Sequence, residues 1–173
     1  MTYTLIAHQE LTSSQASITF SSIPQTFTDL LIQTSLRGDR NDAIELANLS
    51  FNGTSANRTW RYLRGLDTAA GSFSGTSAET GFFPTAQSAT NTFGSMSIYI
   101  PNYRVASSKS FSADNASPTT PTTWASLFLV AGLWSNNTAI TSITLSGLAN
   151  LVSGSSATLY GITAGSSGGV VVS

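Results

Sequence analysis

Residues 16–32 read ASITFSSIPQTFTDLLI and hold two strand patterns separated by a turn signal. Over the first five positions, apolar residues alternate with hydroxyl residues, as in a strand with one buried face. Two serines and Pro24 then break this pattern, and the apolar run Asp29–Leu36 follows. That run suits a strand that is buried on much of both faces. The stretch therefore predicts a fold built from short β-strands joined by tight connections.

The same alternation of strand pattern and turn signal continues along the chain, and no segment of helical length shows a 3.6-residue period. We therefore expect an all-β domain over residues 1–163, a single-domain, jelly-roll-like β-sandwich of about ten short strands. Its most apolar segment, Trp124–Trp134, is expected to be the central strand. The other strand patterns cover Thr2–Ala7, Ile44–Phe51, Thr59–Leu66, Met96–Ile100, Ser107–Ala113, Ile140–Leu145 and Ala157–Ile162.

Residues 67–92 depart from this regularity, because they show little periodicity and are rich in glycine, serine, threonine and alanine. They predict a long functional loop. Phe82 and Phe83 lie in its middle and would be costly to leave in water. We therefore expect this loop to dock onto a surface.

Residues 164–173 form a Gly/Ser-rich segment that ends in Val170, Val171 and Val172. Its composition is that of a flexible linker followed by a small β-prone tag. One interpretation is a disordered tail, as is common at chain termini. The other is an arm that adds a strand to a neighbouring chain.

Composition limits the classes of function. Charged residues make up only 9% of the 173 residues, whereas about 25% is usual. The net charge of −1 favours association and argues against nucleic-acid binding. No apolar run approaches the roughly 20 residues that span a membrane, and we expect no secretory signal. The absence of cysteine excludes disulfides and thiolate chemistry.

Few residues offer chemistry. His8 is the only histidine, and a local hydrogen bond at a strand end is favoured over a Ser-His-Asp arrangement. Asp39, Asn41 and Asp42 could form a cation loop, but their spacing is not that of an EF-hand and favours a polar turn. We expect no catalytic residue, no metal and no cofactor, so that the protein is not an enzyme.

Most charged residues lie between Arg37 and Asp67, beside large aromatic side chains. A strand over Thr59–Leu66 carries large side chains on both faces, so one face should meet something besides the core. Arginine with aromatic neighbours is typical of protein interfaces, and a solvated face with intrachain ion pairs is the alternative. Trp60 could instead stack on a sugar ring. The candidate interface residues are Arg58, Trp60, Arg61, Tyr62, Arg64, Phe82 and Phe83, together with Val170, Val171 and Val172.

Four stretches, residues 16–32, 97–103, 131–145 and 159–162, together resemble a family of small β-rich virion proteins of tailed bacteriophages. Members of that family are head decoration (cement) proteins or parts of tail fibres. The resemblance implies a capsid decoration protein on the exterior of the virion, bound to the major capsid protein as a homo-oligomer, with a trimer favoured. The alternative is a tail-fibre module that recognises host surface glycans. A polysaccharide depolymerase ranks below both, because the chain has one histidine and no paired acidic motif.

Overall fold

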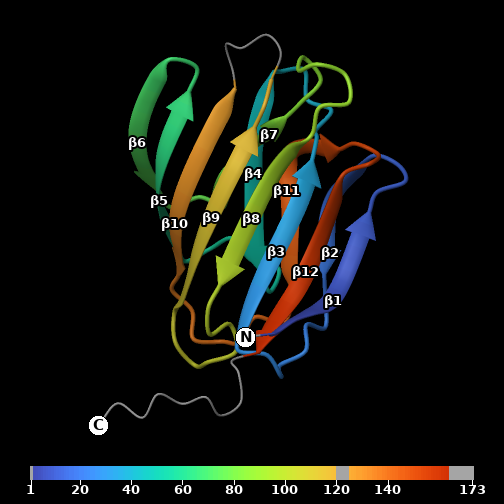
Figure 1. Ribbon diagram of the computed structural model, residues 1–173. Helices are drawn as coiled ribbons and strands as arrows, with labels where there is room; N and C mark the ends of the chain where they lie inside the picture. The colour runs from blue at the N-terminus through green and yellow to red at the C-terminus, as the bar shows by residue number, and fades with distance from the viewer. Residues whose placement is uncertain (1, 120–124, 164–173) are drawn as a thin grey trace.

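The computed structural model describes residues 2–119 and 125–163 (Figure 1). This part of the chain is all-β, as predicted, and none of it forms a helix long and apolar enough to cross a membrane. The expected tail, with Val170, Val171 and Val172, lies outside the described residues, as does Trp124. The strands are β1 (Thr2–Glu10), β2 (Gln15–Phe20), β3 (Asp29–Leu36), β4 (Ile44–Phe51), β5 (Arg58–Leu66), β6 (Ala69–Gly75), β7 (Glu79–Pro84), β8 (Gly94–Ile100), β9 (Lys109–Ser117), β10 (Ser126–Trp134), β11 (Ile143–Leu151) and β12 (Ser156–Thr163).

Two antiparallel sheets pack face to face. The larger has the order β1-β12-β3-β8-β9-β10-β5-β6, and the smaller has the order β2-β11-β4-β7. Within them, β1 pairs with β12, β2 with β11, β3 with β8 and β4 with β7. These nested pairs, divided between two four-stranded layers, have the arrangement of a jelly roll. The expected jelly-roll-like β-sandwich is thereby confirmed.

The strands β9, β10, β5 and β6, here called the extension, widen the larger sheet beyond the jelly roll. In Figure 1 they follow β8 toward the left edge of the molecule, where β6 is the last strand. The smaller sheet ends at β7, which contacts β8, β9 and β10. The inner side of β5 still meets the smaller sheet, because Arg58 lies against the Phe51 ring of β4, and β6 is the outermost strand.

The expectation of a long loop over residues 67–92 is wrong, because β6 and β7 both lie within it. Most residues of β6 are glycine, serine or alanine, so the strand shows no period of hydrophobicity. It forms because it pairs along its length with β5. The expected position of the most apolar strand is also corrected. The strand is β10, and it lies between β9 and β5 with only β5 and β6 beyond it.

Alternation along the strands builds the core. In β3, Leu30 and Ile32 point inward and are fully buried, as are Ile98 in β8 and Leu49 in β4. Phe83, from the segment that was expected to be a loop, is 1% exposed and belongs to the same core cluster. The predicted docking of this segment is therefore onto the protein's own core.

One carboxylate is buried where β4 meets β11. Glu45 is 1% exposed, and its Oε2 accepts hydrogen bonds from the backbone N–H groups of Leu148 (3.3 Å) and Ala149 (3.2 Å). A side chain at Gly38 or Gly147 would collide with this carboxylate. Its Oε1 has no hydrogen-bond partner among the described residues. Burial raises the pKa of Glu45, although the two backbone hydrogen bonds oppose this shift.

The raised pKa of Glu45 gives a prediction on stability. The folded state keeps the Glu45 proton to higher pH than the unfolded state does, so this group loses stabilising effect as the pH rises from its unfolded pKa through its folded pKa. The free energy of unfolding of Glu45→Gln minus that of the wild type should therefore increase as the pH rises from about 4 to 7. Urea unfolding of both proteins across this range measures the difference. A difference that stays constant or shrinks with rising pH would contradict the burial effect.

Candidate interaction face

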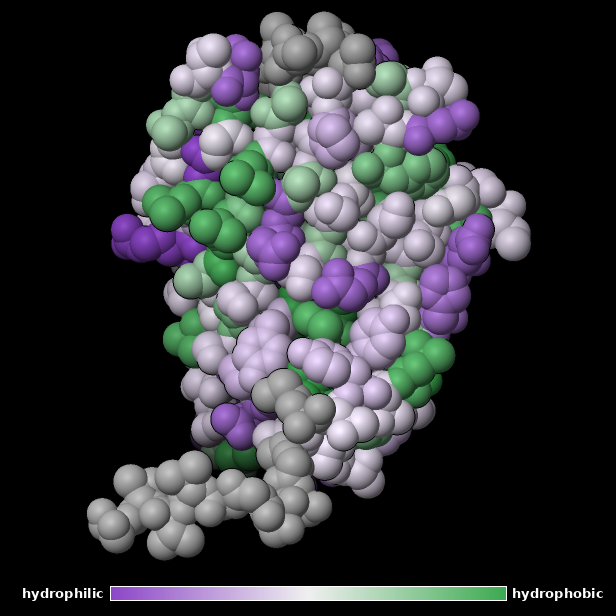
Figure 2. All heavy atoms as spheres, viewed as in Figure 1, coloured by the Kyte–Doolittle hydropathy of each residue, from purple (hydrophilic) through white to green (hydrophobic). Residues whose placement is uncertain are grey.

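The outward side of β10 and β5 carries a continuous group of apolar side chains. Leu63 and Leu127 are each 58% exposed, Leu129 is 55% exposed and Leu133 is 37% exposed. Leu63 lies directly opposite Leu129 in the β5–β10 register. We call these four residues, with Ala131 between them on β10, the leucine face. Figure 2 shows it as a green group over β5 and β10.

The surface of the leucine face is uneven. Leu63 and Leu129 border a hollow whose floor includes Gly65, Ala70 and Gly71. They also border a second hollow, on the side of Arg61 and Ala131. Leu63 and Leu129 line both hollows and therefore form a ridge between two depressions. Such a surface can receive a complementary apolar surface.

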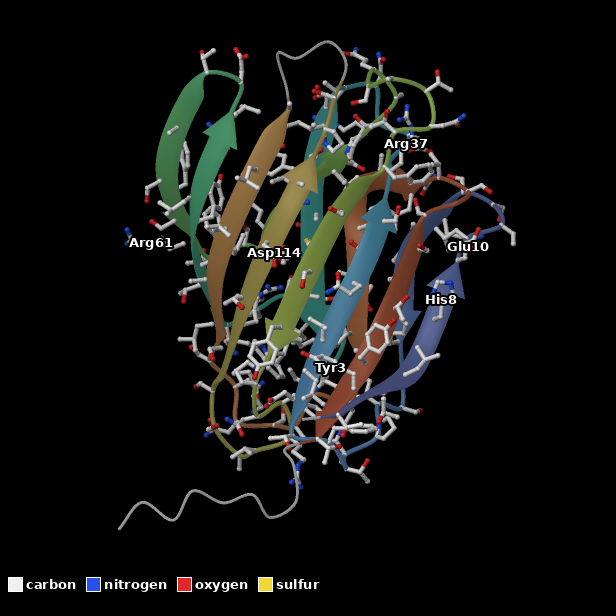
Figure 3. All side chains as sticks on the ribbon, viewed as in Figure 1. Tyr3, His8, Glu10, Arg37, Arg61 and Asp114 are labelled. Carbon is white, nitrogen blue, oxygen red and sulfur yellow. The ribbon has the colours of Figure 1, made fainter. Side chains whose placement is uncertain are left out.

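Opposite charges flank the leucine face. Arg61 is exposed on β5 and lies opposite Ala131, while Asp114 is exposed on β9 and lies opposite Leu129. In Figure 3 the two side chains stand on the same side of the larger sheet, with β10 between their strands. Neither has an ion-pair partner within residues 2–119 and 125–163. Both remain available to a neighbouring molecule.

Four of the predicted interface residues prove to be internal. Sequence alternation places Arg58, Trp60 and Tyr62 on one side of β5 and Arg61 on the other, and the structure confirms this division. However, the shared side is the inner one. Arg58, Trp60 and Tyr62 are at most 8% exposed, and Phe83 is also buried, so the chain itself covers the side chains that were expected at an interface.

Aromatic stacking produces this burial. Trp60 stacks on Tyr62 at 4.7 Å between ring centroids, and Tyr62 meets Phe128 of β10 edge-on at 5.2 Å. Phe82, half-buried on β7, stacks on Phe128 at 4.6 Å. The Phe73 ring of β6 also lies against Tyr62, at 5.3 Å between ring centroids. Phe82 therefore joins the smaller sheet to the inner side of the extension, and Trp60 is not open to a sugar ring.

The remaining predicted arginines lie at different depths. Arg64 is half-buried, and its guanidinium lies 4.5 Å from the centre of the Phe73 ring. Arg58 is 2% exposed, and its guanidinium carbon lies 5.4 Å from the centre of the Phe51 ring and 5.0 Å from that of Phe111. None of the three side-chain nitrogens of Arg58 has a hydrogen-bond partner among the described residues. Burial lowers its pKa to about 10.

The polar candidates each have a local partner. His8 Nδ1 is 2.8 Å from the Thr158 hydroxyl on the neighbouring strand. Asp39 accepts from the backbone N–H of Asn150 (3.0 Å), and Asp42 accepts from that of Ala43 (2.8 Å). Within the described residues, no three side chains of His, Asp or Glu gather as metal ligands. The polar-turn interpretation of residues 39–42 fits these contacts.

A row of tyrosines, absent from the predicted site residues, lies on the outward side of the jelly roll. Tyr160 of β12 and Tyr99 of β8 both lie opposite Leu31 of β3. Tyr3 is 56% exposed on the edge strand β1 (Figure 3). The Tyr99 hydroxyl donates to Asp29 at 2.8 Å. These tyrosines lie on three strands that are distant in sequence, so only the sheet order brings them together.

Comparisons with family models, with curated proteins and with solved structures found no match to this chain. The resemblance to phage virion proteins therefore stays a prediction.

The buried Arg58 yields one prediction. Arg58→Met should raise the free energy of unfolding by about 1 kcal/mol or more, because an unpaired buried charge costs several kcal/mol and cation–π contacts return about 2. Urea unfolding at neutral pH measures the change. Arg61→Met is the matched control on the exposed side of the same strand and should change stability by less than about 0.5 kcal/mol. A large loss of stability in Arg58→Met would show that the charge is compensated.

Phe82 yields a second prediction. Phe82→Ala should lower the free energy of unfolding by about 2 kcal/mol, below the usual range for fully buried phenylalanine because Phe82 is only half-buried. Phe82→Leu keeps most of the apolar volume and should cost less than about 1.5 kcal/mol. Thermal unfolding followed by near-ultraviolet circular dichroism reports on both. Equal stability of Phe82→Ala and the wild type would mean that this stack does not hold the extension.

Proposed function

We propose that this chain is a structural protein of a phage virion that decorates the outer surface of the capsid and stabilises the shell. The leucine face supports this proposal most directly. Monomeric soluble proteins rarely expose large contiguous apolar patches, and such patches mark association surfaces. Here the patch lies on regular strands in a chain with few charges and a net charge of −1. These properties suit a protein that acts by association.

The energetics of the leucine face favour binding in many copies. Complete burial of a leucine stabilises by about 1.5–3 kcal/mol, so half-exposed leucines contribute about 1 kcal/mol each. Association costs roughly 4–15 kcal/mol in lost freedom of motion. Four leucines therefore support weak binding by a single copy. Repeated, linked sites on a capsid lattice turn weak contacts into stable attachment, and the proposed partner is the major capsid protein.

The tyrosine row supports a second candidate, a tail-fibre module that binds host glycans. Tyrosine rings offer an apolar face with a polar tip, a combination that suits sugar rings. In this alternative Tyr3, Tyr99 and Tyr160 replace Trp60, which is buried. The Tyr99 hydroxyl is already engaged by Asp29, which holds that ring in place.

The location of the protein in the particle distinguishes the two candidates. Quantitative mass spectrometry of separated heads and tails should find many copies of this chain per head, in a fixed ratio to the major capsid protein. Isolated wild-type protein should also bind heads stripped of it, and Leu129→Asp should bind them less. A few copies confined to tails would overturn capsid decoration in favour of the tail-fibre candidate. Absence from purified virions would overturn both.

A further inference from the structure

We infer that a second copy of this chain packs on the leucine face, so that two larger sheets lie face to face about a two-fold axis. The inference rests on the proposed function in treating the leucine face as the surface of association. It adds that a second copy covers this face in protein that is free of the capsid, and it gives the symmetry of that contact. Three features of the face, its apolar centre, its flanking charges and its rim, support a second copy.

The apolar centre of the face can meet a copy of itself. A two-fold axis places the same surface patch on both sides of an interface, so the patch must contain its own complement. About an axis that runs in the interface along β10, Leu127, Leu129 and Leu133 each lie across from the same residue of the other copy, so apolar side chains meet apolar side chains. Sheets packed face to face lie about 10 Å apart, which allows leucines from two layers to interdigitate.

The charges also complement themselves. If the axis runs in the interface along β10, then β5 of one copy lies over β9 of the other, because these strands flank β10 on opposite sides. This places Arg61 of each copy near Asp114 of its partner. Arg61 lies opposite Ala131, and Asp114 lies opposite Leu129. Ala131 and Leu129 are adjacent on the same side of β10, so the two charged side chains are offset by two residues along the strands. A long arginine side chain can span such an offset.

The rim of the proposed interface is polar. The same axis brings β6 of one copy over β8 of the other. Ser72 and Ser74 lie opposite Leu63 and Arg61 in the β5–β6 register and so share the outward side. On β8 the outward residues at the same level are Ser97 and Tyr99, which lie opposite Asp114 and Ser112 of β9. An apolar centre with a hydroxyl rim is the usual anatomy of a protein interface.

A two-fold pairing differs from the trimer that the family resemblance implies. A ring of three needs two different complementary patches on each copy, whereas one self-complementary patch closes as a pair.

Sedimentation velocity of the full chain over a range of micromolar concentrations tests this inference. The wild type should shift from monomer to dimer with rising concentration. Leu63→Asp and Leu129→Asp should weaken dimerisation at least tenfold, since each places a charge in the apolar centre. Leu148→Asp is the matched control, because Leu148 is 57% exposed on β11 and lies outside the leucine face; it should dimerise like the wild type. Circular dichroism checks that each variant is folded.

Exchanging the charges of Arg61 and Asp114 tests the proposed direction of the two-fold axis. Arg61→Glu and Asp114→Arg should each weaken dimerisation, and the double variant should recover it, because the pair is restored with reversed signs. A monomeric wild type at every concentration, a trimer, or Leu129→Asp that dimerises like the wild type would overturn the inference. So would a double variant as weak as the singles. If the protein is a monomer but is abundant on heads, this inference fails and the proposed function stands. If it is a dimer but is absent from virions, the proposed function fails and this inference stands.

Discussion

The aromatic contact between β7 and the inner side of the extension determines which side chains the larger sheet exposes to other molecules. Phe82 stacks on Phe128, which meets Tyr62, which in turn stacks on Trp60. Side chains alternate between the two faces of a strand, so the residues next to these buried rings must point outward. A slip of one residue in β10 would exchange the two sets. The inward rings therefore force Leu63, Leu127, Leu129 and Leu133 outward.

That constraint connects the fold to the proposed function. A jelly roll alone needs only the eight strands of its two four-stranded layers, and its inner faces cover each other. The extension widens one layer without widening the other. A wide sheet of this kind gains an outward surface that the protein's own second layer cannot cover. Placing leucines on that surface is unfavourable for an isolated monomer and favourable for a protein that works as part of an assembly.

Much of the fold can be predicted from sequence because its strands carry strong local patterns. The alternation in residues 16–20 and 96–100 and the apolar run 29–36 all mark strands of the jelly roll. The division of Arg58, Trp60 and Tyr62 from Arg61 is also correct. Sequence could not show which of the two sides faces inward, because both sides of β5 carry large residues. It could not find β6 either, since pairing with β5 stabilises that strand and its small side chains leave no periodic signal. The excess of apolar residues on both sides of β10 was the available sign of the leucine face.

The proposed dimer covers the leucine face. Leucine methyl groups can be observed one by one by NMR in selectively labelled protein, with a soluble paramagnetic probe that broadens signals exposed to solvent. At low protein concentration the probe should broaden the methyl signals of Leu63, Leu127, Leu129 and Leu148 alike, since all four are more than half exposed. At high concentration the first three should become protected while Leu148 stays accessible. Equal broadening of all four signals at every concentration would contradict the account.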